Sequence, residues 1–187
     1  MRDQTLTLFC PSTRYELCSN REGTLKLFIA GENKGDHRIY QPEGESRPTI
    51  DVEAVRLDEY FKDLKRGIDV LKMDVQGAEG HIFDGMTGLL EGRNDGPTIF
   101  MELWPFALKS MGTDAGDMLK KLQSDHYTFY NVNPQERGPA LRVEPADLLA
   151  AHPIEEREAQ GNILALRGGR EPPKDLVLRG AKDPLKD

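Results

Sequence analysis

Two short apolar segments, each followed by a helical pattern, place the strongest limit on how this chain can fold. Ile68–Val75 is rich in β-branched and apolar residues, which is typical of a strand inside a parallel sheet. It leads into 78–86, whose apolar residues form a helical stripe. Thr98–Leu103 is a second strand of the same kind. Two strands that each lead into a helix favour right-handed crossovers, so we expect them to be adjacent central members of one sheet.

The rest of the chain fits the same α/β class. We predict further strands at 14–18, 24–29, 52–56, 127–132 and 162–167, and helices at 57–64 and 114–123, the second capped by Thr113. The segment 31–48 carries Gly, Asn, Asp, Pro and Ser with few large apolar residues, which indicates a long, mobile loop. The order of elements predicts one domain over residues 1–167 with a largely parallel sheet, followed by an extended or disordered tail at 168–187.

Composition narrows the possible partners and location. The chain has 187 residues, with 25 basic and 32 acidic side chains and a net charge of -7. Such a surface repels phosphate backbones and anionic lipids, so we expect neither nucleic acid nor a membrane as a partner. No apolar run approaches the roughly 20 residues that span a bilayer. The polar start does not resemble a secretory signal, and two cysteines make no disulfide framework, so we expect a reducing, cytoplasmic location.

Three carboxylates follow the two central strands. Asp74 ends the first strand, Glu79 lies in the first turn of the next helix, and Glu102 lies at the end of the second strand. Ligands of open α/β sheets bind at the carboxyl ends of strands, so these groups could converge on one rim that holds an amine, a hydroxyl or a cation. Equally, Glu79 could only complement the helix N-terminus while Asp74 caps it. No His, Cys, Asp and Glu spacing typical of zinc is present, so we expect no metal site.

The same segment carries a family resemblance. Residues 68–79, with the sequence IDVLKMDVQGAE, resemble the signature of FkbM-type methyltransferases, which use S-adenosylmethionine. Other pieces resemble the family in the same order, and they are VRLD at 55–58, LCSNREGTLKL at 17–27, IFME at 99–102 and NILA at 162–165. The match covers about residues 13 to 167, and its combined order is more specific than any single piece.

This resemblance implies a Rossmann-like class I methyltransferase sheet, S-adenosylmethionine as cofactor and a small-molecule or glycan acceptor. It implies O-methylation of a sugar or secondary-metabolite hydroxyl. Asp74 and Glu79 would face the methionine end of the cofactor, and Ser19 and Asn20 its adenine edge, although a plain turn also explains that pair. Asp74 and Glu102 are the catalytic candidates, with Glu102 as a base or an anchor, or as a carboxylate bonded only to nearby backbone.

The sequence departs from the family pattern at two places. Gln76 stands where the family usually has glutamate, and no counterpart of the family's first strand, glycine-rich turn and ribose-binding acid precedes residue 13. We therefore expect a sheet that is incomplete on its N-terminal side and weak or absent binding of S-adenosylmethionine by this chain. The alternative function is a truncated, non-catalytic module that relies on a partner chain or is a fragment of a longer enzyme. A homo-oligomer could cover the exposed sheet edge.

Overall fold

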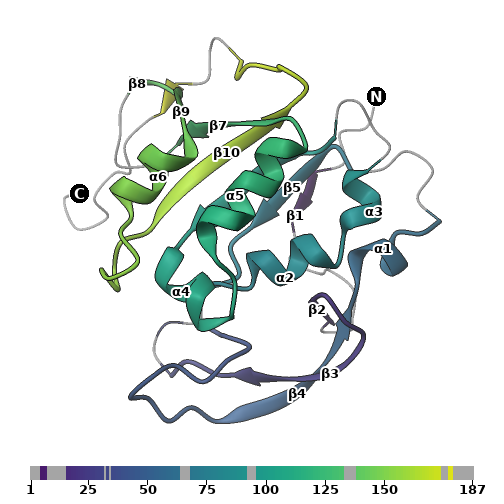
Figure 1. Cartoon of the computed structure of the whole chain (residues 1–187). Coiled ribbons are helices and arrows are strands. Elements are labelled where there is room, and N and C mark those ends of the chain that lie inside the picture. The colour runs from purple at the N-terminus through teal and green to yellow at the C-terminus, as the bar shows by residue number, and fades with distance from the viewer. Residues whose placement is uncertain are drawn as a thin grey trace, which may run out of the picture.

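The computed structural model describes residues 5–7, 16–31, 33, 35–63, 68–91, 96–132, 138–173 and 177–178. In these ranges the chain forms a six-stranded sheet, a three-stranded sheet and a two-stranded pair, with helices packed on the larger sheet (Figure 1). The predicted α/β class is confirmed, and the arrangement is consistent with a Rossmann-like fold.

The six-stranded sheet has the strand order β1-β5-β6-β10-β7-β9. Its strands are β1 (Thr5–Thr7), β5 (Val70–Met73), β6 (Thr98–Leu103), β7 (Tyr127–Asn131), β9 (Leu141–Val143) and β10 (Gly161–Arg167). The pairs β1 with β5 and β5 with β6 are parallel, as expected for the two central strands. The remaining three pairs are antiparallel, so the expectation of a largely parallel sheet is wrong. The reason is that the chain re-enters the sheet at the end where β7 finishes, so β10 lies reversed between β6 and β7.

The smaller sheet has the order β2-β4-β3 and shares no ladder with the larger one in the described ranges. Its strands are β2 (Glu16–Cys18), β3 (Gly23–Phe28) and β4 (Thr49–Val55). The loop predicted at 31–48 connects β3 to β4, and its ends are pinned because Phe28 and Arg38 form a β-bridge and the Ile29 N–H donates to the Pro48 carbonyl at 2.9 Å. The remaining strands, β8 (Gly138–Pro139) and β11 (Val177–Leu178), pair with each other and bring part of the predicted tail into an ordered contact.

Six short helices lie in the described ranges. They are α1 (Leu57–Tyr60), α2 (Glu79–Asp84), α3 (Thr87–Leu90), α4 (Pro105–Ser110), α5 (Ala115–Ser124) and α6 (Pro145–Ala151). The cap of α5 is Asp114 and not the predicted Thr113, because the Asp114 carboxylate accepts the Asp117 N–H at 2.9 Å. Thr113 instead fills the space beside Gly80, where an added Cβ would meet its side chain.

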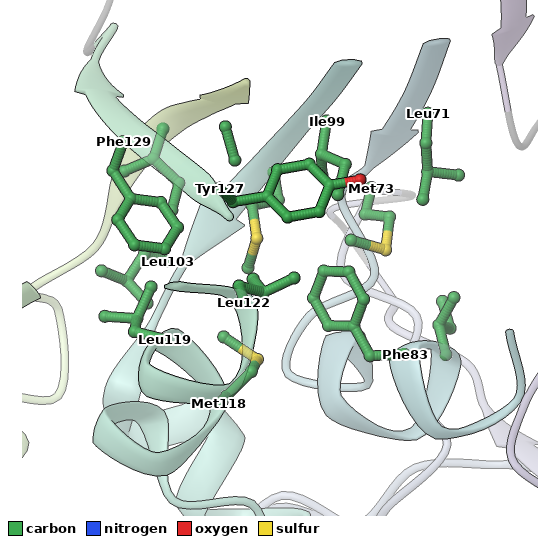
Figure 2. Packing of buried hydrophobic residues seen from close by; sticks show 14 of the residues in the cluster. Leu71, Met73, Phe83, Ile99, Leu103, Met118, Leu119, Leu122, Tyr127 and Phe129 are labelled. Atoms are coloured by element: carbon green, nitrogen blue, oxygen red, sulfur yellow. The ribbon is translucent and has the colours of Figure 1, made fainter. Parts of the chain in front are cut away.

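The main hydrophobic core lies between the six-stranded sheet and the helices α2 and α5 (Figure 2). Leu71 and Ile99 of the central strands are fully buried, and Phe83 of α2 and Leu119 of α5 pack against the same layer. Because β5 and β6 are held by this core, the residues that follow them at their carboxyl ends occupy fixed positions.

A side-chain cap ties the smaller sheet to the helices. Asp58, which follows β4, accepts the backbone N–H of Leu89 at 2.9 Å and that of Gly88 at 3.2 Å. Both N–H groups belong to the first turn of α3, and that of Leu89 is shared with the Met86 carbonyl at 3.0 Å, so the Asp58 carboxylate caps a helix that lies about 30 residues further along the chain. The leucine-aspartate pair of the sequence pattern thus has a structural role.

The capping role predicts a clear loss of stability on substitution. Asp58→Ala removes an acceptor shared by two backbone donors, so we expect the free energy of unfolding to fall by about 1–2 kcal/mol. Urea denaturation monitored by circular dichroism measures this change. The matched control is Asp63→Ala at an exposed position, which should change stability by less than about 0.5 kcal/mol. Equal effects of the two substitutions would contradict the cap.

Candidate functional site

The register between β5 and β6 sets two carboxylates side by side. Met73 is paired with Met101, so Asp74, directly after β5, lies level with Glu102, the last but one residue of β6. Gln76 joins them, because its side-chain Nε2 donates to Asp74 Oδ1 at 3.1 Å and to Glu102 Oε2 at 3.5 Å. We call Asp74, Gln76 and Glu102 the carboxylate rim. The structure thus brings together the two residues that the sequence marks as catalytic candidates.

The turn that carries Gln76 has an uncommon backbone. Gln76 has φ of 55° and Gly77 has φ of 99°, both in the left-handed region. A Cβ on Gly77 would lie 2.6 Å from the backbone of Ala107 in α4, so this turn packs directly on the helix that follows β6. Strained conformations of this kind persist where surrounding contacts determine them, and here they aim the Gln76 amide at both carboxylates.

Two glycines allow a matched test of this close approach. Gly112 also has a left-handed φ, of 78°, but an added Cβ there meets no atom within 4 Å. We expect Gly112→Ala to cost about 1–2 kcal/mol from backbone strain alone. Gly77→Ala should cost about 1–3 kcal/mol more, because the new methyl overlaps Ala107. Chemical denaturation of both variants gives the comparison, and equal losses would show that the Gly77 turn does not press on α4.

Glu79 is buried, whereas Asp74 of the carboxylate rim is exposed. Glu79 is 1% exposed, and its Oε1 accepts the Val75 N–H at 3.3 Å, while the buried Oε2 has no hydrogen-bond partner among the residues that the structure describes. Burial, with a smaller effect of the Glu102 charge, raises the pKa of Glu79 to about 7. This geometry supports the reading in which Glu79 serves the turn and helix start, and its predicted binding of cofactor stays a prediction.

Glu102 is half-buried between charges of both signs. Burial and then the nearby Asp74 raise the pKa of Glu102 to about 7, while Arg38 and Lys72 act in the opposite direction. Lys72 is exposed on the face of β5 opposite to Met73 and lies 3.5 Å from Asp74 Oδ2. A carboxyl group that titrates near neutrality is suited to accept or donate a proton at physiological pH.

The buried Glu79 predicts a measurable pH dependence of stability. Its pKa is about 7 in the folded chain against an ordinary value of 4.5, so between these values the folded state binds more protons than the unfolded state. The free energy of unfolding therefore falls as pH rises through this window. Above it Glu79 is ionised in both states and adds no further pH dependence. Glu79→Gln should remove about 2 kcal/mol of this fall between pH 5 and pH 7.5, as measured by urea denaturation at each pH.

The control for this measurement is Glu53→Gln, at an exposed position of β4. Its stability should follow the pH profile of the parent chain. A Glu79→Gln profile parallel to that of the parent chain would contradict the buried, protonated state of Glu79.

Ser19 and Asn20 lie at the other end of α2. An added Cβ on Gly85, which ends α2, would lie 2.1 Å from the Ser19 carbonyl oxygen, and Arg56 donates to the Asn20 carbonyl at 2.8 Å. Ser19 is buried, and its hydroxyl is 3.4 Å from the Asn20 side-chain oxygen. No contact described in the structure joins this turn to the carboxylate rim, which lies beyond the other end of α2, a helix about 9 Å long. The predicted adenine contact stays a prediction.

Sequence reasoning missed Arg38, and for Trp104 it favours packing over the sheet edge, with substrate stacking as the alternative. Arg38 belongs to the polar loop, where an arginine carries no signal of burial, yet it is 7% exposed and its guanidinium lies 4.8 Å from the centre of the Trp104 ring. Trp104 is 6% exposed and donates from Nε1 to the Arg157 carbonyl at 2.7 Å. Both therefore lie close to the end of β6 that carries Glu102.

The described ranges hold neither a metal-binding cluster nor a membrane-spanning helix. No group of three or more His, Cys, Asp and Glu side chains there is arranged to hold a metal ion. None of the helices in those ranges combines the length and the hydrophobicity that crossing a bilayer requires.

Comparison with known proteins places this geometry in a family. Residues 10–129 match the model of the methyltransferase FkbM domain, which is more than half of the chain. Neither the curated proteins nor the solved structures include a significant match. The matched range contains the carboxylate rim, Glu79 and the turn at Ser19 and Asn20, so the chain belongs to the FkbM methyltransferase family.

Proposed function

We propose that this chain is an S-adenosylmethionine-dependent methyltransferase that methylates a hydroxyl group of a sugar or secondary metabolite at the carboxylate rim. The observation that carries the proposal is the pair of carboxylates, Asp74 and Glu102, joined by Gln76 at the carboxyl ends of two adjacent parallel strands. This is the edge at which open α/β sheets bind ligands. Membership of the FkbM family supports methyl transfer as the reaction.

The chemistry of the rim fits the charge of the cofactor. S-adenosylmethionine supplies an electrophilic methyl group on a positively charged sulfur and also carries an ammonium group. Asp74 is exposed and has one exposed ion-pair partner, Lys72, so its carboxylate can receive the ammonium group. Exposed ion pairs of this kind contribute little free energy, so replacing Lys72 by the ammonium group as the partner of Asp74 costs little.

Glu102 is the group that can take the proton of an acceptor hydroxyl. An alcohol must lose its proton during methylation, and a base whose pKa lies near the working pH is the most effective. Glu102, with a pKa of about 7, meets this condition. The two carboxylates also repel an anionic acceptor, which favours an uncharged hydroxyl compound. Alignment of acceptor oxygen, methyl carbon and sulfur is then the main task of the protein.

Calorimetric titration with S-adenosylmethionine tests the binding role of Asp74. We expect weak binding to the parent chain. Asp74→Ala should weaken this binding further by roughly tenfold to a hundredfold, the effect of one charge-assisted contact of about 1.5–3 kcal/mol that the bound cofactor shields from water. Glu102→Gln should change it only a few-fold, since Glu102 is assigned to the acceptor.

The control for this titration is Asp51→Ala, which removes an exposed carboxylate of the smaller sheet and should leave binding unchanged. Two results would overturn the proposal. One is an equal affinity for S-adenosylmethionine in the parent chain and in Asp74→Ala. The other is no heat of binding for the parent chain at millimolar cofactor.

A further inference from the structure

The loop between β3 and β4 is held against the end of β6 by one buried arginine. Arg38 donates to Asp36 from Nε at 2.6 Å and to the Tyr40 hydroxyl from Nη1 at 2.8 Å. Its guanidinium stacks on Trp104, which stands two residues after Glu102. Arg38 therefore orders the loop through its hydrogen bonds and holds it on Trp104 through the flat face of its guanidinium, a contact that is stronger for an arginine removed from water than for an exposed one.

A second set of ion pairs fixes the far half of the loop. Arg47 contacts Asp36 Oδ2 at 2.6 Å and Glu45 Oε2 at 2.7 Å, and its side chain is buried. Glu45 in turn lies 3.8 Å from Arg157, the residue whose carbonyl accepts the Trp104 N–H. Asp36 thus joins the two buried arginines, and although burial opposes it, hydrogen bonds from Arg47 and Arg38 lower the pKa of Asp36. Figure 1 shows this part of the chain below α4.

Charged groups on three parts of the chain act on Glu102. They are Lys72 in β5 with Asp74 after it, Arg38 and Asp36 in the loop, and Glu79 in α2. Arg38 fixes the loop at Trp104, two residues after Glu102, whereas Asp74 follows the neighbouring strand β5. The loop and Asp74 therefore approach Glu102 from different elements of the fold.

We propose that the segment 36–47 is the acceptor-side wall of the carboxylate rim, and that Arg38 is the positioning residue that locks this wall against Trp104. The inference rests on the proposed function and adds to it the surface that the acceptor meets. Each arginine of the wall is paired with Asp36 or Glu45. The wall thus offers an anionic acceptor no unpaired arginine, which favours an uncharged one.

The chain offers a direct reporter of this lock, since Trp104 is its one tryptophan. Acrylamide quenching of tryptophan fluorescence should be low in the parent chain and should rise several-fold in Arg38→Met, because the loop no longer covers the ring. Arg142→Met, which removes an exposed arginine from an exposed ion pair, should leave quenching unchanged. Cooperative thermal unfolding of each variant shows that it is folded. Unchanged quenching in a folded Arg38→Met would overturn the lock.

A second readout tests whether Arg38 faces Glu102. The titration of Glu102, followed by NMR of side-chain-labelled glutamate and assigned by its loss in Glu102→Gln, should move upward by about one pH unit in Arg38→Met. Arg38→Lys, which keeps the charge, should restore much of the parent value. A Glu102 titration that does not respond to Arg38→Met would overturn the positioning role.

Cofactor titration then separates this inference from the proposed function. Arg38→Met should bind S-adenosylmethionine within a few-fold of the parent chain, while Asp74→Ala binds much more weakly. Loss of binding in Arg38→Met equal to that in Asp74→Ala would place the loop on the cofactor side and overturn the inference. If the parent chain itself binds no cofactor, the proposed function fails and the acceptor-side assignment fails with it, whereas the lock on Trp104 is still decided by the quenching measurement.

Discussion

The pairing of β5 with β6 is the constraint on which the rest of the site depends. Both strands are apolar on their buried positions, and Leu71 and Ile99 are paired and fully buried. A shift of this register by one residue would turn buried side chains toward the other face of the sheet, so the core fixes it strongly. Because the register is fixed, Asp74 and Glu102 emerge together, and one amide side chain can reach both.

Two carboxylates that lie together at a half-buried edge repel each other, and several neighbouring side chains offset this repulsion. Gln76 contributes an amide donor where a third acid would add repulsion, and Lys72 and Arg38 lower the pKa of Glu102. Burial still dominates, so Glu79 and Glu102 both titrate near neutrality. A proton-transfer site needs this balance, because a fully compensated carboxylate would stay ionised and be a weak base.

Apolar patterns in the sequence predict the central strands and the rim. They do not predict features that depend on strand direction or on tertiary packing. The runs at β5 and β6 identify adjacent strands, and the acids after them follow from strand direction. An apolar run such as that of β10 carries no sign of its direction, so its reversal could not be foreseen. Glu79 looks like any acid in a first helical turn, and only tertiary packing shows that it is buried. Arg38 in a polar loop is indistinguishable from a solvated arginine until Trp104 is placed beside it.

The absence of a shared ladder between the two described sheets has a consequence for dynamics. The smaller sheet is attached to the larger sheet and its helices by side-chain and backbone contacts. Notable ones are those of Asp58 with α3, Ser19 with Gly85, and Arg38 with Trp104. A unit attached in this way can open as a cooperative foldon at a free energy below that of global unfolding. Opening would withdraw the loop from Glu102. A ligand that contacts both the rim and the loop binds only the closed form, so its affinity depends in part on the local stability of a hairpin that it touches only at one end.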